Sequence, residues 1–259
     1  MVKKIVGTGV LLVLALALQA GVKMYTLKSP DGKVKLEVTA GQGIAYSLFY
    51  DGRLLLKPSR IALHTDLPEA DHWENIRITG TKQRHVSETV QAPFYRVKEF
   101  GIDCNELELR LNNGFSLLMR AYNDGMAYRF VAGRKGEMTG VEERAEFNFA
   151  DDFEAYIPYS TNPKDPWNMA FQNFYTKAPL TQYNTELPAF LPLTVDVGAV
   201  KLTLLESDLE AYPGMFVCGD GKTPALKGVF AAYPQETFKN KWRCQETVKT
   251  CRPYIARVA

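Results

Sequence analysis

The strongest signal along this chain is an alternation of apolar and polar residues with a period of two. Successive side chains of a β-strand point to opposite faces of the sheet, so this pattern places one set in a core and the other in solvent. The alternation is clearest in residues 33–39, 107–111, 191–197 and 200–204. The sequence therefore predicts a strand at each of these places.

Turn-forming residues separate the alternating stretches. Asp51-Gly52, Asn123-Asp124-Gly125 and Asp220-Gly221 are examples. Asp-Gly and Asn-Gly pairs tolerate the positive φ angles that tight hairpins need. Residues 115–122 and 126–131 lie on either side of one such turn, which predicts a β-hairpin there.

The pattern favours an all-β fold with antiparallel sheets. No long stretch has the 3.6-residue apolar period, so we expect only short helices, around residues 167–174 and 208–212. Many short strands with regular turns are typical of a sandwich or a barrel. Without a repeat or a linker, residues 24–259 are expected to form one domain, in which the irregular stretch 160–190 is a candidate functional loop.

The first 20 residues have the features of a signal peptide. Lys3 and Lys4 precede an apolar run that is shorter than the roughly 20 residues of a membrane-spanning helix, and small residues follow at Ala17 and Ala20. We therefore expect a secreted or periplasmic protein, with an uncleaved membrane anchor as the alternative. No other segment is apolar and long enough to span a bilayer.

Composition narrows the choice of function. The 259 residues are 46% hydrophobic, which is enough for a sizeable core, and a net charge of +2 gives no basic footprint of a nucleic-acid binder. Export permits disulfides, and Cys244 and Cys251 have a spacing that suits a bridged hairpin, although free packed cysteines are an equal alternative. Without a C-x-x-C pair, a zinc site is not expected.

Acidic residues offer only weak candidates for catalysis. Glycoside hydrolysis needs two carboxyl groups on opposite sides of the scissile bond. Neighbours on a strand point to opposite faces, so Glu142-Glu143 and Asp151-Asp152 are poor pairs. Glu206 and Asp208 can share a face, but a solvated turn explains them as well. Nucleophile-elbow, zinc-protease and phosphate-loop motifs are absent.

The segment WNMAFQNFY, residues 167–175, is a candidate for sugar recognition. Aromatic rings stack on the apolar faces of pyranoses while amide side chains bond their hydroxyl groups. Trp167 and Asn173 are therefore the residues expected to contact a substrate. Ordinary loop packing is an equally good explanation, because aromatic residues bury much area.

Six segments together resemble the N-terminal domain of glycoside hydrolase family 97. They occur in the family's order and cover about residues 28–259. The segments are SPDGKVKLEV (29–38), the block containing K-P-S (46–63), NELELRL (105–111), RAYNDGMAYRF (120–130), AYIP (155–158) and LLESDLEAYPGM (204–215). Several moderately specific motifs in one order make a strong resemblance.

The resemblance implies a specific architecture. Members of the family have an N-terminal super-β-sandwich of the galactose-mutarotase type, a central (β/α)8 barrel that carries the catalytic carboxylates, and a small C-terminal β-domain. They hydrolyse α-glucosides or α-galactosides, with retention or inversion. This chain has no βαβ pattern, so the catalytic barrel is expected to be absent and no residue here is expected to be catalytic. The substrate would be an α-linked oligosaccharide, and the partner would be the barrel.

The resemblance also implies a calcium ion. In relatives, a glutamate of the N-terminal domain joins the calcium shell, and the matching position here is Gln172. A glutamine carbonyl is a neutral oxygen that calcium accepts, so metal binding would be weakened rather than lost. Two other functions remain: a free-standing carbohydrate-binding sandwich, and a structural module that stabilises a barrel by packing against it.

Overall fold

A computed structural model of the chain describes residues 23–167, 171–210, 212–239 and 246–258. Residues 1–20, where the sequence predicts a signal peptide, lie outside these ranges. Within them, no helix is long and apolar enough to cross a membrane.

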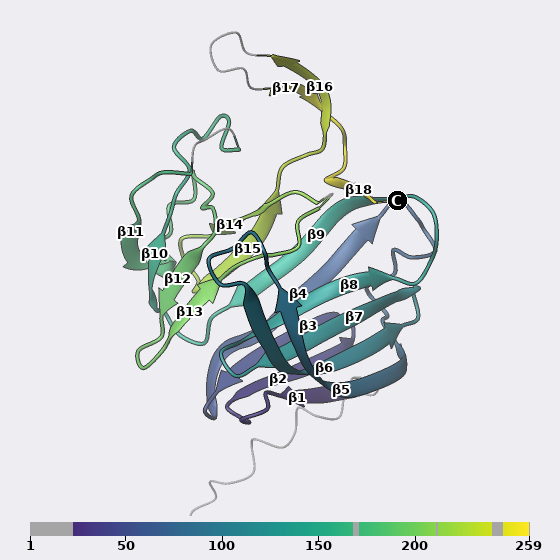
Figure 1. Cartoon of the computed structure of the whole chain (residues 1–259). Helices are drawn as coiled ribbons and strands as arrows, with labels where there is room; N and C mark the ends of the chain where they lie inside the picture. The colour runs from purple at the N-terminus through teal and green to yellow at the C-terminus, as the bar shows by residue number, and fades with distance from the viewer. Residues whose placement is uncertain (1–22, 168–170, 211, 240–245, 259) are drawn as a thin grey trace, which may run out of the picture.

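The described residues form four antiparallel sheets (Figure 1). The largest has eight strands in the order β1-β2-β3-β4-β9-β15-β14, with β18 also paired to β9. Its strands are β1 (Lys23–Lys28), β2 (Val34–Gly41), β3 (Gly43–Tyr50), β4 (Arg53–Thr65), β9 (Met138–Asn148), β14 (Met215–Gly219), β15 (Ala225–Phe230) and β18 (Ala256–Val258). The second sheet is β5 (Ile78–Gln91), β6 (Glu99–Leu111), β7 (Phe115–Tyr122) and β8 (Gly125–Ala132), in that order.

Two smaller sheets complete the structure. One has the order β11-β10-β12-β13, from β10 (Glu154–Ile157), β11 (Thr176–Pro179), β12 (Leu193–Asp196) and β13 (Lys201–Leu204). The other is a hairpin of β16 (Pro234–Lys239) and β17 (Glu246–Cys251), which projects from the body in Figure 1. The all-β antiparallel fold expected from the pattern is confirmed, and so is the sandwich that the resemblance implies.

The core lies between the inner faces of the first two sheets. Val34, Leu36 and Val38 of β2 are buried on one side, and Leu107 and Leu109 of β6 on the other. These are residues of the alternating stretches, so the period of two does place an apolar stripe inside. Burying such side chains contributes about 25 cal/mol per Å² of apolar area removed from water.

The expected hairpin around Asn123 is confirmed. β7 pairs with β8, from Phe115 opposite Ala132 to Tyr122 opposite Gly125. The turn at Asp51-Gly52 also forms as the sequence indicates, with φ of 49° and 77° at these residues. Two successive positive φ angles are the requirement of a type I′ turn, which matches the twist of the strands it joins.

Two local expectations are wrong. The described residues of 167–174 and 208–212 are not helical, and the helix observed in the described part of the chain is a single turn at Leu180–Gln182. The residues before Cys251 form one extended strand that pairs with β16, rather than a hairpin of their own. Cys251 is a free thiol, as are Cys104 and Cys218, while Cys244 lies outside the described residues.

Candidate functional site

A buried carboxylate joins three strands of the second sheet. The side chain of Glu106 on β6 is only 5% exposed, and it accepts hydrogen bonds from Arg84 Nε (2.6 Å) on β5 and Arg120 Nε (2.8 Å) on β7. Burial pushes the pKa of Glu106 upward, but the bonds and charges of the two arginines outweigh it, so the pKa lies below its usual value. The group is an ionised cross-strand clamp.

This clamp forms the floor of an open hollow. Lys82, Glu108, Ser116 and Leu118 complete most of its wall, and its volume is about 290 Å³. Its residues alternate with the core residues of the same strands, so the hollow lies on the outer face of the sheet.

A second carboxylate, that of the half-buried Glu143 of β9, has tyrosines as its hydrogen-bond partners. Tyr212 donates its hydroxyl to Glu143 Oε2 at 2.6 Å, and Tyr128 of β8 also bonds the carboxyl group. Burial raises the pKa of Glu143, the tyrosine bonds oppose the rise, and the nearby Glu206 adds to it. Burial also raises the pKa of Tyr212, so its hydroxyl keeps its proton and remains a donor.

The described residues of the segment 205–214 are fastened to the sandwich at two further points. Both oxygens of Glu206 accept the backbone N–H of Met215, at 2.9 and 2.8 Å. Asp208, with a left-handed φ of 61°, forms an ion pair with Arg129 Nη2 of β8 at 2.9 Å. Glu206 and Asp208 were weak catalytic candidates, and both serve here as anchors of the chain.

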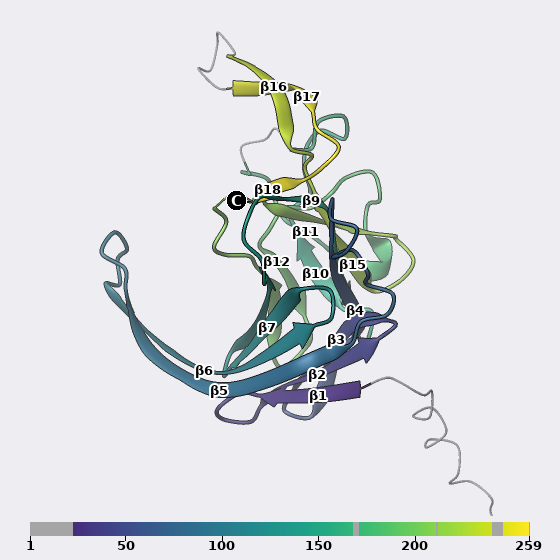
Figure 2. The same cartoon turned by 90° about the vertical axis from the view of Figure 1, so that its right-hand side faces the viewer.

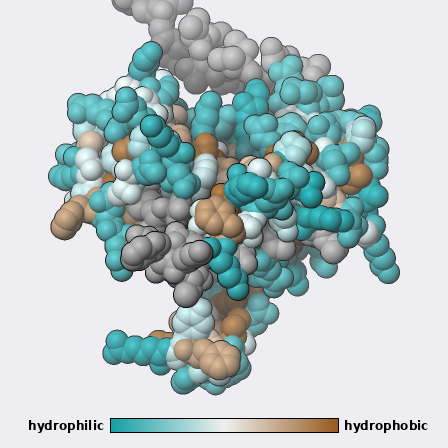
Figure 3. Space-filling view, turned by 90° about the horizontal axis from the view of Figure 1, so that it is seen from above, coloured by the Kyte–Doolittle hydropathy of each residue, from teal (hydrophilic) through white to brown (hydrophobic). Residues whose placement is uncertain are grey.

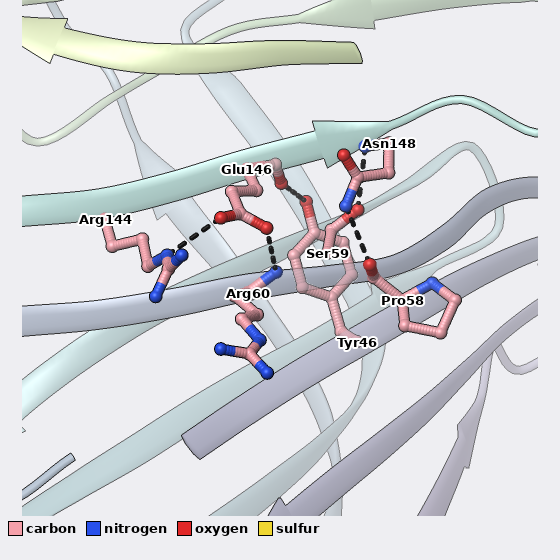
Figure 4. Close-up of polar contacts among 7 residues, drawn as sticks. All are labelled: Tyr46, Pro58, Ser59, Arg60, Arg144, Glu146 and Asn148. Atoms are coloured by element: carbon pink, nitrogen blue, oxygen red, sulfur yellow. Dashed lines mark hydrogen bonds and ion pairs between the residues drawn. The ribbon is translucent and has the colours of Figure 1, made fainter. Parts of the chain in front are cut away.

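The K-P-S motif forms an irregularity between β4 and β9 (Figure 4). Leu56 bridges Phe149 and Ile61 pairs with Ala145, so β4 has one residue more than β9 in this interval. The buried Ser59 Oγ accepts the backbone N–H of Asn148 at 2.9 Å. The motif therefore supplies the hydrogen bond that the strand ladder loses at a β-bulge.

A polar hollow of about 370 Å³ lies beside this bulge. Gln42, Arg60, Glu146 and Asn148 are among its lining residues. Glu146 is held by Arg144 Nε at 2.8 Å and by the backbone N–H of Arg60 at 3.2 Å (Figure 4). Its carboxylate is thus already bound to the protein, and its pKa is lowered because these bonds outweigh the effect of burial.

The aromatic loop is folded against the start of β14. The ring of Trp167 packs edge-on against the ring of Phe216, with 4.8 Å between the ring centroids. The ring of Phe171 also packs against Phe216, with a centroid distance of 6.0 Å. Asn173 Nδ2 donates to the backbone carbonyl of Tyr159 at 2.8 Å, and its Oδ1 accepts the N–H of Phe174. Trp167 and Asn173 therefore hold the loop in shape, and their contact with a sugar stays a prediction.

Two other aromatic residues of this loop are exposed, and neither was among the expected substrate contacts. Phe174 is 95% exposed and Tyr175 is 46% exposed. These two side chains offer free ring faces, whereas the ring of Trp167 packs against Phe216. Nothing in the alternation pattern separates exposed from packed aromatics within an irregular loop.

Gln172, the expected calcium ligand, is exposed in the same loop. Calcium takes six to eight oxygen ligands, and the described residues bring together no group of three His, Cys, Asp or Glu side chains that could hold a metal. These residues alone do not fit a complete calcium site, and Gln172 could supply only one neutral ligand of a shared one.

The remaining acidic pairs have structural partners. Glu142 is exposed while Glu143 is half-buried, as expected for neighbours on a strand. Asp152 accepts the N–H and the hydroxyl of Thr181, at 3.0 and 2.6 Å, and so joins the start of β10 to the single helical turn. Sequence reasoning missed Tyr212 as the partner of Glu143 and Arg84 as the partner of Glu106, because each is far from its partner in the chain.

Comparison with solved structures shows the fold again. A glycoside hydrolase family 97 enzyme from Pseudoalteromonas sp. strain K8, in complex with acarbose, superposes with a TM-score of 0.65 at 17% identity, over 80% of this chain and 32% of that chain. A β-arabinopyranosidase gives a TM-score of 0.68 at 20% identity, over 80% and 35%.

Two curated relatives match by sequence. A retaining alpha-galactosidase from Bacteroides thetaiotaomicron is 38% identical over 251 residues, which is 94% of this chain and 38% of that protein. A probable retaining alpha-galactosidase from Streptomyces bingchenggensis is 25% identical over 158 residues, which is 60% of this chain and 24% of that protein. The chain thus spans well under half the length of these relatives.

The family model described as glycosyl-hydrolase 97 N-terminal matches residues 27–251. That range includes the clamp at Glu106, the bulge at Ser59 and the anchors of segment 205–214. The chain therefore belongs to glycoside hydrolase family 97, and residues 27–251 match the family's N-terminal domain.

Proposed function

We propose that this chain is the N-terminal, non-catalytic domain of an exported α-glycosidase, which packs on the catalytic barrel and helps to form its sugar pocket. The observation that carries the proposal is the family match over residues 27–251, in a chain that spans 38% of the Bacteroides thetaiotaomicron relative. The rest of such an enzyme is long enough for a catalytic domain of ordinary size.

The proposed substrate class is an α-linked oligosaccharide. Both curated relatives are named as retaining alpha-galactosidases, the second as a probable one, which supports an α-galactoside in preference to an α-glucoside. The free-standing carbohydrate-binding module considered above is not favoured, because the match is to a domain of much longer hydrolases.

The contribution of this domain to the sugar pocket is assigned to the loop around residues 167–175. Phe174 presents a free ring, and Asn173 fixes the backbone on which that ring stands. We keep Trp167 and Asn173 as proposed substrate-binding residues, acting chiefly by shaping the loop. Gln172 is a proposed ligand of a calcium ion whose remaining ligands would come from the barrel.

The experiment uses the chain alone and a fusion in which it replaces the matched region of the Bacteroides thetaiotaomicron enzyme. We expect the chain alone to leave p-nitrophenyl α-galactoside and α-glucoside intact, and the fusion to hydrolyse the galactoside. Hydrolysis by the chain alone would overturn the assignment, as would an inactive but soluble and folded fusion.

A binding measurement separates this proposal from a free-standing sugar-binding module. We expect calorimetric titration of the chain with melibiose and maltose to give dissociation constants weaker than about 1 mM, equivalent to about 4 kcal/mol of binding free energy. Micromolar affinity would favour the binding module.

A further inference from the structure

The two longest strands of the second sheet extend beyond their neighbours. β5 and β6 pair continuously, from Gly80 opposite Arg110 to Gln91 opposite Glu99. β7, in contrast, pairs only with residues 104–110 of β6. Residues 87–103, called the arm below, therefore form a two-stranded ribbon that curves away from the body (Figure 2). An isolated pair of strands is marginally stable in water, so the arm is a structure that benefits from a partner.

The tip of the arm is a defined turn. The backbone N–H of Ala92 donates to the carbonyl of Lys98 at 2.7 Å, and the N–H of Tyr95 donates to the carbonyl of Ala92 at 3.0 Å. Gln91 bonds Glu99 across the base of the turn at 2.9 Å, and Lys98 Nζ donates to the carbonyl of Pro93. A turn fixed in this way presents its side chains with little conformational entropy left to lose on binding.

Five apolar side chains are exposed at or near this tip. Phe94 is 98% exposed, the largest fraction of any large hydrophobic residue in the described part of the chain, and Tyr95 is 70% exposed. Val90, Val97 and Phe100 are 41–52% exposed. Seen from above, the arm projects with apolar surface at its end (Figure 3). Adjacent exposed aromatics of this kind mark an interaction site.

We propose that the tip of the arm is the anchor by which this domain holds the catalytic domain of the same polypeptide, with Phe94 and Tyr95 inserted in an apolar socket there. This rests on the proposed function, because the socket belongs to the barrel. The size of the exposed apolar surface indicates a partner in the same polypeptide. The five side chains expose on the order of 500 Å², whereas separate chains need about 800 Å² from each partner. A tethered domain needs less, because its effective concentration is high.

The charges near the tip fit an apolar socket with a polar rim. Lys98 and Glu99 are bonded within the turn itself, to Pro93 and Gln91. Arg96 is the charged side chain of the turn for which the described residues provide no partner. A tip with one available positive charge beside two aromatic rings suits an interface whose centre is apolar and whose edge is acidic.

The test measures backbone hydrogen exchange of the wild-type arm in the chain alone and in the fusion with the Bacteroides thetaiotaomicron catalytic part. We expect exchange in residues 90–100 to slow by about tenfold or more in the fusion. The double variant Phe94→Ser/Tyr95→Ser should lose most of that protection and make the fusion more sensitive to limited proteolysis. Met24→Ser, which changes a residue 63% exposed on β1, is the matched control and should change neither measurement.

The outcomes separate this inference from the proposed function. An active fusion in which the arm exchanges as fast as in the chain alone overturns the docking role and leaves the proposed function standing. An inactive, folded fusion overturns the proposed function whatever the arm does. A chain that dimerises, or binds anionic lipid vesicles, in a manner abolished by Phe94→Ser/Tyr95→Ser would assign the tip to a second copy or to a membrane and overturn the inference.

Discussion

Glu106 on β6 and Arg120 on β7 face each other directly across the second sheet, with Arg120 Nε 2.8 Å from Glu106 Oε2. Each residue belongs to one of the motifs by which the family is recognised, N-E-L for Glu106 and R-x-Y-N-D-G for Arg120. One motif supplies a buried carboxylate and the other its guanidinium, so the two motifs depend on each other physically.

Glu106→Gln is expected to lower the free energy of unfolding by about 2 kcal/mol, the usual contribution of a hydrogen bond to a charged group. The pKa of Glu106 is held below its ordinary value of 4.5, so its stabilisation is present above that value and is lost as the pH falls through the lowered pKa. The difference between wild type and Glu106→Gln should therefore shrink on acidification, as measured by urea unfolding at a series of pH values.

The matched control for this prediction is Glu108→Gln on the same face of β6. Its nearest hydrogen-bond partner, Ser116 Oγ, is 3.4 Å away, so the change should alter stability by less than about 0.5 kcal/mol. Equal effects of the two substitutions would show that the clamp contributes nothing beyond an ordinary surface carboxylate.

The alternation of residues was enough to predict some of the strands that form the core. β2 and β7 each have one face fully buried, so their period of two is complete and readable. β5 is exposed along almost its whole length, with Val86 as its buried residue, and thus has no apolar stripe to reveal it. Pairings such as Ile61 with Ala145 join residues too far apart in sequence for any local pattern to indicate.

The candidate site was less accessible to sequence reasoning. Glu106, Arg120 and Tyr212 lie within segments that resemble the family, but sequence reasoning assigned them no role, because their partners are set by the fold rather than by spacing. Trp167 and Phe174 belong to one aromatic loop, yet one ring packs on Phe216 and the other stands in solvent. Composition gives the same expectation for both rings, and only tertiary packing distinguishes them.

Glu143→Gln is expected to be at least as stable as the wild type near neutral pH. Burial raises the pKa of Glu143 above 4.5, so the folded state holds the proton more tightly than the unfolded state, and stability falls as the pH rises through the raised pKa. Glutamine does not ionise and keeps an oxygen for the hydroxyl of Tyr212. Thermal unfolding of both proteins across this range should show the advantage of glutamine vanishing below about pH 4.5.

Glu142→Gln is the control for this second carboxylate. Glu142 is the next residue along β9, but it is exposed and points to the opposite face. Its substitution should change the stability by less than about 0.5 kcal/mol. A wild type that gains stability over Glu143→Gln as the pH rises would contradict the predicted sign.

Ser59→Ala is expected to destabilise the domain by about 1–3 kcal/mol, because it removes a buried hydroxyl that accepts the backbone N–H of the half-buried Asn148. Ser47→Ala on β3 removes the same hydroxyl from a half-buried site where the described residues provide it with no hydrogen bond, and it should cost much less. Denaturant unfolding of both variants measures the difference, and similar losses would mean that the K-P-S hydroxyl does not maintain the bulge.

Gly219→Ala should destabilise the fold by about 1–3 kcal/mol through overpacking. A Cβ at this position of β14 would lie 2.7 Å from Tyr183 Cγ. The ring has no room to move, because the tyrosine is buried and its hydroxyl donates its single proton to the carbonyl of Val217 at 2.7 Å, with the carbonyl of Leu187 3.1 Å away. Gly101→Ala on β6 meets no atom within 4 Å and should stay within about 0.5 kcal/mol of the wild type. A Gly219→Ala protein as stable as Gly101→Ala would show that Tyr183 is not held in place by its burial and its hydroxyl hydrogen bond.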